Sequence, residues 1–108
     1  MAEFINPVDL NEKLNSDDRP FVIDVRSSDE YNEGHVPGAV NIPIDVLSNR
    51  LTEIPKERQI VPYCNMRHRG NSRGERAAQY LLENGFKAIA IDGGFVDWNK
   101  AGLPVERT

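Results

Sequence analysis

The residues best suited to covalent chemistry are one cysteine and the basic segment that follows it. Cys64 is the only cysteine of the 108-residue chain, and the segment 64–76 holds four arginines against one acid, Glu75. The segment is therefore +3, whereas the remaining chain, with 9 basic against 16 acidic residues, is −7. Nearby positive charge favours the thiolate, which is the nucleophilic form of a cysteine. The pattern predicts that Cys64 reacts with an anionic group, although an incidental core cysteine beside a solvated loop fits the same composition.

Composition and charge argue against several other kinds of site. One cysteine excludes an internal disulfide and a multi-cysteine zinc site, and it indicates a reducing, cytoplasmic setting. The two histidines, His35 and His68, lack metal-ligand spacing, so no metal is expected. A net charge of −4 disfavours binding of nucleic acid through bulk charge. The sequence has no apolar run of about 18 residues and no signal-peptide pattern at its start, so no membrane contact is expected.

Alternating strands and helices are expected to position the thiol. Apolar runs predict strands at residues 4–5, 20–25, 59–63 and 86–91. Caps and helical spacing predict helices that begin after Asn6 and that cover 29–33, 44–54, 77–82 and 94–98. The segment 34–43, rich in glycine and proline, predicts an ordered loop. This alternation indicates one α/β domain over residues 1–108, with a mainly parallel sheet and helices on both faces.

The place of Cys64 in this scheme narrows the chemistry. Ligands of such sheets bind beyond the carboxyl ends of the strands, and Cys64 directly follows the strand at 59–63. Pro62 within that strand predicts a local irregularity. The loop N–H groups, the next helix N-terminus and the arginines all favour a bound anion. Such an anion-binding loop favours attack of the sulfur on an oxyanion, and it equally favours a persulfide held as a covalent intermediate. The pattern does not distinguish these two reactions.

Three stretches of the chain carry recognisable motifs. They are residues 21–26 with Glu30-Tyr31 and 34–43, the segment from Tyr63-Cys64 to Ala77-Ala78, and Gly93-Gly94-Phe95 with Trp98 and 102–105. In this order and spacing they resemble the N-terminal signature, the active-site region and the C-terminal signature of the rhodanese family. The stand-alone, single-domain sulfurtransferase type is the most similar.

The resemblance implies a rhodanese-like fold of about five mostly parallel strands with helices on both faces. It implies that Cys64 takes sulfane sulfur from a donor such as thiosulfate, holds it as a persulfide and passes it to cyanide or a thiol. The acceptor thiol could belong to a small molecule or to a thioredoxin-like protein, and no cofactor is needed. The substrate-binding residues would then be Asn65, Met66, Arg67, His68, Arg69, Gly70, Asn71, Ser72 and Arg73.

The loop after Cys64 departs from the family pattern, in which four residues separate the cysteine from an arginine. Arg69 fits that count, but Gly70 follows it in place of a hydroxyl residue. Counting back from Ala77-Ala78 selects Arg73 instead and makes the loop four residues longer. We predict Arg73, because the helix after it fixes its position. Fold relatives with a loop one residue longer than usual act on phosphate or arsenate, and this loop matches neither length. A phosphatase, an arsenate reductase and a non-catalytic binding module therefore stay open as alternatives.

Four polar residues near the first long strand are expected to support the site. Arg26 and Glu30 lie one helical turn apart and predict a structural ion pair. His35 is expected to hydrogen-bond within its loop, with Asp24 as the partner, rather than to act as a general base.

Overall fold

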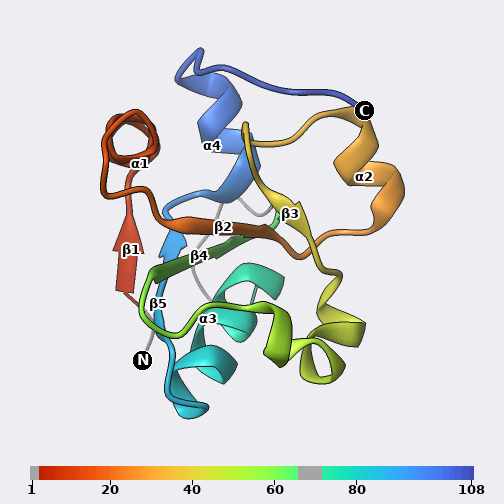
Figure 1. The fold of residues 1–108 in the computed structure, drawn as a ribbon. Helices are drawn as coiled ribbons and strands as arrows, with labels where there is room; N and C mark the ends of the chain where they lie inside the picture. The colour runs from red at the N-terminus through yellow and green to blue at the C-terminus, as the bar shows by residue number, and fades with distance from the viewer. Residues whose placement is uncertain (1–2, 66–71) are drawn as a thin grey trace.

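Five parallel strands form one sheet in the order β1-β5-β4-β2-β3 (Figure 1). The structure is a computed structural model that describes residues 3–65 and 72–108. The strands are β1 (Glu3–Ile5), β2 (Phe21–Asp24), β3 (Val40–Asn41), β4 (Gln59–Tyr63) and β5 (Lys87–Ile91). The α-helices are α1 (Pro7–Leu14), α2 (Ser28–Glu33), α3 (Arg73–Glu83) and α4 (Gly94–Lys100), and two 3₁₀ helices are η1 (Ile44–Asn49) and η2 (Leu51–Glu53). The predicted α/β architecture is confirmed.

Alternation along the strands separates two apolar cores, one on each face of the sheet. In β2, Val22 packs with α1 and α4, whereas Ile23 packs with α3 and η1. Successive strand side chains point to opposite faces, so a strand covered on both sides is apolar at nearly every position. Figure 1 shows α1 and α4 on one side of the sheet and α3 with the 3₁₀ helices on the other. None of the helices in the described ranges is long and apolar enough to cross a membrane.

Side-chain caps fix where the helices begin. The Asn6 side chain accepts a hydrogen bond from the N–H of Asp9 at 2.9 Å, so α1 starts at Pro7 as predicted. Ser27 and Glu30 form a reciprocal capping box at the start of α2. Helix α3 is predicted to stop at Asn84-Gly85, and it ends at Glu83 with Asn84 as its C-cap.

Two predictions about the middle of the chain are wrong. The segment 34–43 is not only loop, because Val40–Asn41 forms the edge strand β3 beside Ile23 and Asp24. Residues 44–54 do not form one α-helix, because they form η1 and η2 with a break at Arg50. The apolar residues Ile44 and Leu47, like Leu51 and Ile54, are three apart, and this spacing matches the three residues per turn of a 3₁₀ helix.

Pro62 lies inside β4, where the predicted irregularity is visible in the pairing. The ladder between β4 and β2 runs from Ile60 to Tyr63, whereas the ladder between β4 and β5 includes only Gln59 and Ile60. A proline has no N–H to donate, so pairing on one side of β4 stops short of it. This leaves the carboxyl end of β4, directly before Cys64, less tightly bound to β5.

Candidate active site

Cys64 lies at the carboxyl end of β4, in the middle of the sheet. Its side chain is buried in the core on the α3 face, whereas the preceding Tyr63 points to the opposite face. The Cys64 carbonyl accepts a hydrogen bond from the N–H of Phe95 at 2.8 Å. The chain reaches that position through Gly93 and Gly94, whose φ angles of +77° and +62° favour glycine. The start of α4 therefore lies next to Cys64.

Helix α3 approaches the Cys64 backbone very closely. A Cβ atom on Gly74 would lie 3.2 Å from both the Cys64 nitrogen and the Tyr63 Cα, so only glycine allows this contact without a shift. The N-cap Ser72 accepts from the N–H of Glu75 at 3.1 Å and donates to its carboxylate at 3.2 Å. A helix N-terminus carries partial positive charge. The first turn of α3 therefore presents that charge beside Cys64.

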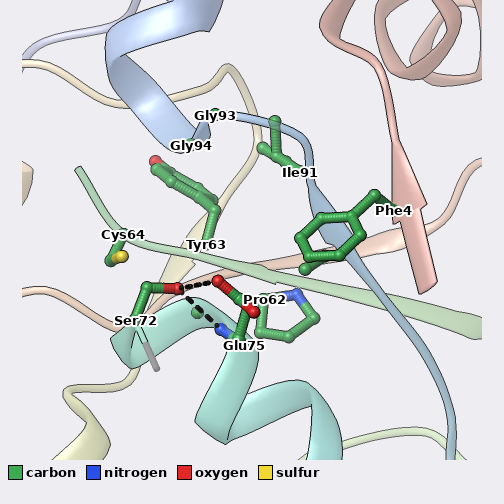
Figure 2. Close-up of a pocket in the computed structure, with 11 residues that line it drawn as sticks. Phe4, Pro62, Tyr63, Cys64, Ser72, Glu75, Ile91, Gly93 and Gly94 are labelled. Carbon is green, nitrogen blue, oxygen red and sulfur yellow. Dashed lines mark hydrogen bonds between the residues drawn. The ribbon is translucent and has the colours of Figure 1, made fainter. Parts of the chain in front are cut away.

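A narrow pocket lies between these helix starts and the end of β4. Figure 2 shows Cys64, Ser72 and the Gly93-Gly94 turn around it, with Phe4 and Ile91 at its far side. The pocket thus brings together residues that are far apart in the sequence. The sequence prediction placed Cys64 and Ser72 in one site, and both line this pocket.

A buried ion pair lies on the α2 side of the Cys64 backbone. Arg26 and Asp24 are 3% and 0% exposed, and the guanidinium binds both carboxylate oxygens through Nε and Nη2 at 2.6–3.1 Å. Burial by itself would lower the pKa of Arg26, but the Asp24 carboxylate outweighs it and raises that pKa. The guanidinium also lies 4.5 Å from the centroid of the Phe95 ring.

Tyr63 hydrogen-bonds to Asp24 of this ion pair, a contact that the sequence analysis did not predict. Its hydroxyl donates to Asp24 Oδ2 at 2.8 Å and accepts from the N–H of Val36 at 3.0 Å. Burial, followed by the charge of Asp24, raises the pKa of Tyr63, so the phenol stays protonated. A tyrosine within a buried strand needs a partner for its hydroxyl, and this need was the available sequence signal.

Asn65 links the buried pair to the surface. Arg26 Nη1 donates to Asn65 Oδ1 at 2.9 Å, and Asn65 Nδ2 donates to Glu30 Oε2 at 2.7 Å. Arg73 Nη1 donates to Glu30 Oε1 at 3.2 Å. Partial burial raises the pKa of Glu30, but hydrogen bonds from Arg73 and the Ser27 backbone outweigh it, and the pKa lies below its usual value. Asp24, Arg26, Asn65, Glu30 and Arg73 thus form one connected polar network.

Two predicted partners are wrong. Arg26 pairs with Asp24 rather than with Glu30, because the β2 carboxylate lies directly beside the guanidinium inside the protein. Glu30 pairs with Arg73 instead. His35 does not bind Asp24: its Nδ1 lies 2.8 Å from the Tyr31 carbonyl oxygen, and its ring stacks on Tyr31 at 3.7 Å between centroids. The hydrogen-bonding positions of Asp24 are filled by Arg26 and Tyr63.

Six of the predicted substrate-binding residues lie outside the described residues: Met66, Arg67, His68, Arg69, Gly70 and Asn71. The remaining three, Asn65, Ser72 and Arg73, flank that segment at the end of β4 and the start of α3. Within the described ranges, no group of three histidine, cysteine, aspartate or glutamate side chains could hold a metal ion.

The fold and the site define an α/β domain with a buried cysteine at the end of its central strand, and sequence comparison identifies the family. The model of the rhodanese-like domain matches residues 6–101. The chain therefore belongs to the rhodanese-like domain family, as the sequence motifs predicted.

Two relatives of similar length carry sulfurtransferase names. A sulfurtransferase of Allochromatium vinosum is 30% identical over 106 residues, which cover 97% of this chain and 95% of the relative. A putative sulfurtransferase of Bacillus subtilis is 32% identical over 100 residues, 93% of each chain. In both cases the similarity extends over nearly the whole of both proteins.

Longer proteins contain similar segments. The chain spans 37% of an HTH-type transcriptional regulator of Mycobacterium tuberculosis, with 40% identity over 85 residues. It spans 31% of a tRNA uridine(34) hydroxylase of Photorhabdus laumondii, with 32% identity. Among solved structures, a rhodanese-like domain protein from Staphylococcus aureus superposes with a TM-score of 0.85 at 26% identity and covers 98% of both chains.

Proposed function

We propose that this protein is a sulfurtransferase that carries sulfane sulfur as a persulfide on Cys64. The observation that carries the proposal is the position of Cys64, buried at the carboxyl end of β4 with the α3 N-terminus packed on its backbone. Two relatives of nearly equal length are named a sulfurtransferase and a putative sulfurtransferase. The matches to a transcriptional regulator and a tRNA hydroxylase involve about a third of those proteins, so they support a shared domain more than a shared activity.

The first half-reaction loads the cysteine. The Cys64 thiolate attacks the outer sulfur of thiosulfate, a new S–S bond forms, and the original S–S bond breaks with its electron pair leaving on sulfite. Positive charge at the α3 N-terminus favours both the thiolate and the incoming dianion. The predicted contacts of Asn65, Ser72, Arg73 and residues 66–71 with the donor belong to this proposal.

The second half-reaction removes the outer sulfur from the Cys64 persulfide. Cyanide or a thiolate attacks the outer sulfur of the persulfide, takes that sulfur, and leaves the electron pair of the broken S–S bond on Cys64. The acceptor thiol belongs to a small molecule or to a thioredoxin-like protein. No metal or organic cofactor takes part in either step.

Mass spectrometry with activity assays tests the proposal. Thiosulfate should add the mass of one sulfur atom to the protein, and cyanide should remove it. Cys64→Ser should lose both the added mass and turnover while its circular dichroism spectrum is unchanged. A Cys64→Ser variant that retained turnover would overturn the proposal, as would wild-type protein that reduced arsenate with glutathione, or cleaved an aryl phosphate, but did not transfer sulfur. A protein inactive in all three assays would point to a binding module.

A further inference from the structure

The side chain of Asn65 lies between a buried cation and a partly buried carboxylate. Arg26 Nη1 donates to Asn65 Oδ1 at 2.9 Å, and Asn65 Nδ2 donates to Glu30 Oε2 at 2.7 Å. A guanidinium can only donate hydrogen bonds, and a carboxylate can only accept them. The group between them must therefore accept on one side and donate on the other. The amide of Asn65 does both, and it does so here in one orientation only.

The cation at one end of this amide is held in place inside the protein. Arg26 is buried, and its Nε and Nη2 donate to the Asp24 carboxylate at 2.6–3.1 Å. The centroid of the Phe95 ring lies 4.5 Å from the Arg26 Cζ, and the Phe95 N–H donates to the Cys64 carbonyl at 2.8 Å. The position of Arg26 Nη1 is therefore defined relative to Cys64.

The carboxylate at the other end also binds the start of α3. Glu30 Oε1 accepts from Arg73 Nη1 at 3.2 Å, so each of its two oxygens has a donor. Glu30 thus joins Asn65, the residue directly after Cys64, to the arginine that is predicted to bind the sulfur donor. A change in the Asn65 side chain would therefore act on both ends of the segment 65–73.

The backbone of Asn65 shares a peptide bond with Cys64. The carbonyl of that bond accepts from the Phe95 N–H. A trans peptide bond is planar, so the Asn65 N–H points away from this carbonyl and from the start of α4. The direction of the N–H is fixed by the Phe95 contact on one side and by the held Asn65 side chain on the other.

We propose that Asn65 is a positioning residue for anion binding at Cys64. Its side-chain amide, with the oxygen toward Arg26 and the nitrogen toward Glu30, fixes the peptide N–H that directly follows Cys64. That N–H is one of the loop donors available to an anionic sulfur donor. The inference rests on the proposed function, and it gives the Asn65 side chain the role of orienting this backbone rather than of contacting the donor.

The same contacts predict which substitution is damaging and which one rescues it. Asn65→Asp keeps the size of the side chain, but it puts a second carboxylate where Glu30 needs a donor. Glu30→Gln leaves one of the two donors, Asn65 or Arg73, without an acceptor. The double variant has the net charge of wild type. In it the amide at position 30 donates to the carboxylate at position 65, and its oxygen accepts from Arg73.

Sulfur transfer and alkylation of Cys64 test the proposal on wild type, both single variants and the double variant. The value of kcat/KM is measured with thiosulfate as donor and cyanide as acceptor. Alkylation rates are measured with iodoacetate, an anion, and with neutral iodoacetamide, so that their ratio reports how well the surroundings of Cys64 bind an anion. Asn99→Asp is the matched control, because Asn99 is an exposed residue of α4 that lines one polar pocket together with Asn65. Urea unfolding gives the stability of each variant.

The proposal expects a loss in Asn65→Asp that the second substitution reverses. Asn65→Asp should lower kcat/KM about tenfold or more, the loss expected for one hydrogen bond to a charged group, and it should lower the alkylation ratio about threefold. The double variant should recover most of both losses, because donors and acceptors again alternate from Arg26 to Arg73. Asn99→Asp should change both values less than about twofold, because its added charge is screened by solvent.

Three results would overturn the inference. If Asn65→Asp behaved like Asn99→Asp, the orientation of the Asn65 amide would not matter. If the loss in the double variant equalled the product of the two single losses, Asn65 and Glu30 would act independently. If the double variant regained stability in urea but neither kcat/KM nor the alkylation ratio, the role of Asn65 would be structural only.

Failure of the proposed function has a different signature. A wild-type protein that transferred no sulfur from thiosulfate to cyanide would overturn that function. The alkylation ratio would still decide the role of Asn65, because it requires only the Cys64 thiolate and a small anion.

Discussion

At the scale of single residues, a buried ion pair organises the surroundings of Cys64. Removing two charges from water is costly, and a buried pair persists where its remaining hydrogen-bonding positions are also filled. Arg26 meets that condition, because its donors bind Asp24, Asn65 and the Gly34 carbonyl. The pair therefore defines the position of Asn65, the residue that follows Cys64.

Arg73 is the arginine for which we predict a role in binding the donor. Its guanidinium is anchored by Glu30 at 3.2 Å, at the start of α3 beside Cys64. Losing one charge-assisted contact to thiosulfate should cost about 1.5–3 kcal/mol, so Arg73→Ala should lower kcat/KM about ten- to a hundredfold. Arg69→Ala should change it little, because a charge outside the donor site is screened by solvent. Both variants are assayed at one ionic strength, with Arg19→Ala as the control.

A larger loss in Arg69→Ala than in Arg73→Ala would contradict this prediction. It would mean that the added residues of the loop follow the donor site rather than lie within it. If neither variant lost activity, backbone N–H groups would hold the donor, and the basic cluster would serve another partner.

At the scale of elements, Glu30 connects three segments that meet at the site. It belongs to α2, caps that helix with Ser27, binds Asn65 after β4 and binds Arg73 at the start of α3. Each bond is modest in a partly exposed position. Together they hold the two ends of the segment 65–73 to the same helix.

The pH dependence of stability tests the role of Glu30. Its pKa is lowered from 4.5 in the folded protein, so its contribution is present above pH 4.5 and is lost as the pH falls through the lowered value. Glu30→Gln should reduce the free energy of unfolding by about 1 kcal/mol at pH 7. The difference from wild type should shrink below pH 4.5, as measured by urea unfolding at several pH values.

Glu57→Gln serves as the control for simple loss of an exposed carboxylate. A difference between wild type and Glu30→Gln that stayed constant from neutral to acid pH would contradict the prediction. It would show that the carboxylate contributes through packing and not through its charge.

At the scale of the whole molecule, the sheet separates two apolar cores, and it is a question whether they unfold in one transition or in two. Trp98 of α4 is the only tryptophan, is 0% exposed, and donates its indole N–H to the Pro104 carbonyl at 2.7 Å. It reports on the face covered by α1 and α4, whereas α3, the longest helix, covers the other face. We predict one cooperative domain, because the strands between the two faces contribute side chains to both.

Urea unfolding followed by two probes tests this prediction. Trp98 fluorescence and far-ultraviolet circular dichroism should give one midpoint, as expected of a two-state domain. The unfolding free energy should fall in the usual range of about 5–15 kcal/mol. A fluorescence transition at lower urea than the circular dichroism transition would mean that the α4 face unfolds separately.

Local chemistry explains why much of this molecule was predictable from its sequence. The cap at Asn6, the stop at Asn84-Gly85 and the nearly continuous apolar runs of β2 and β4 depend on neighbouring residues. The place of Cys64 was predictable for the same reason, because it is the only thiol and directly follows a strand, whereas its role as the nucleophile stays a prediction. Parallel topology followed from the alternation of strands and helices.

What the sequence alone determined was therefore the fold class, the order of most elements and the place of the one thiol at the end of a strand. Only the tertiary structure decided which side chains pair. Asp24 forms an ion pair with Arg26 and accepts a hydrogen bond from Tyr63, and Glu30 forms an ion pair with Arg73. Strand β3 forms because Val40–Asn41 lies beside β2. The physical reason is that an ion pair or an edge strand depends on distances in space. Spacing along the chain constrains such distances only within one helix, strand or turn.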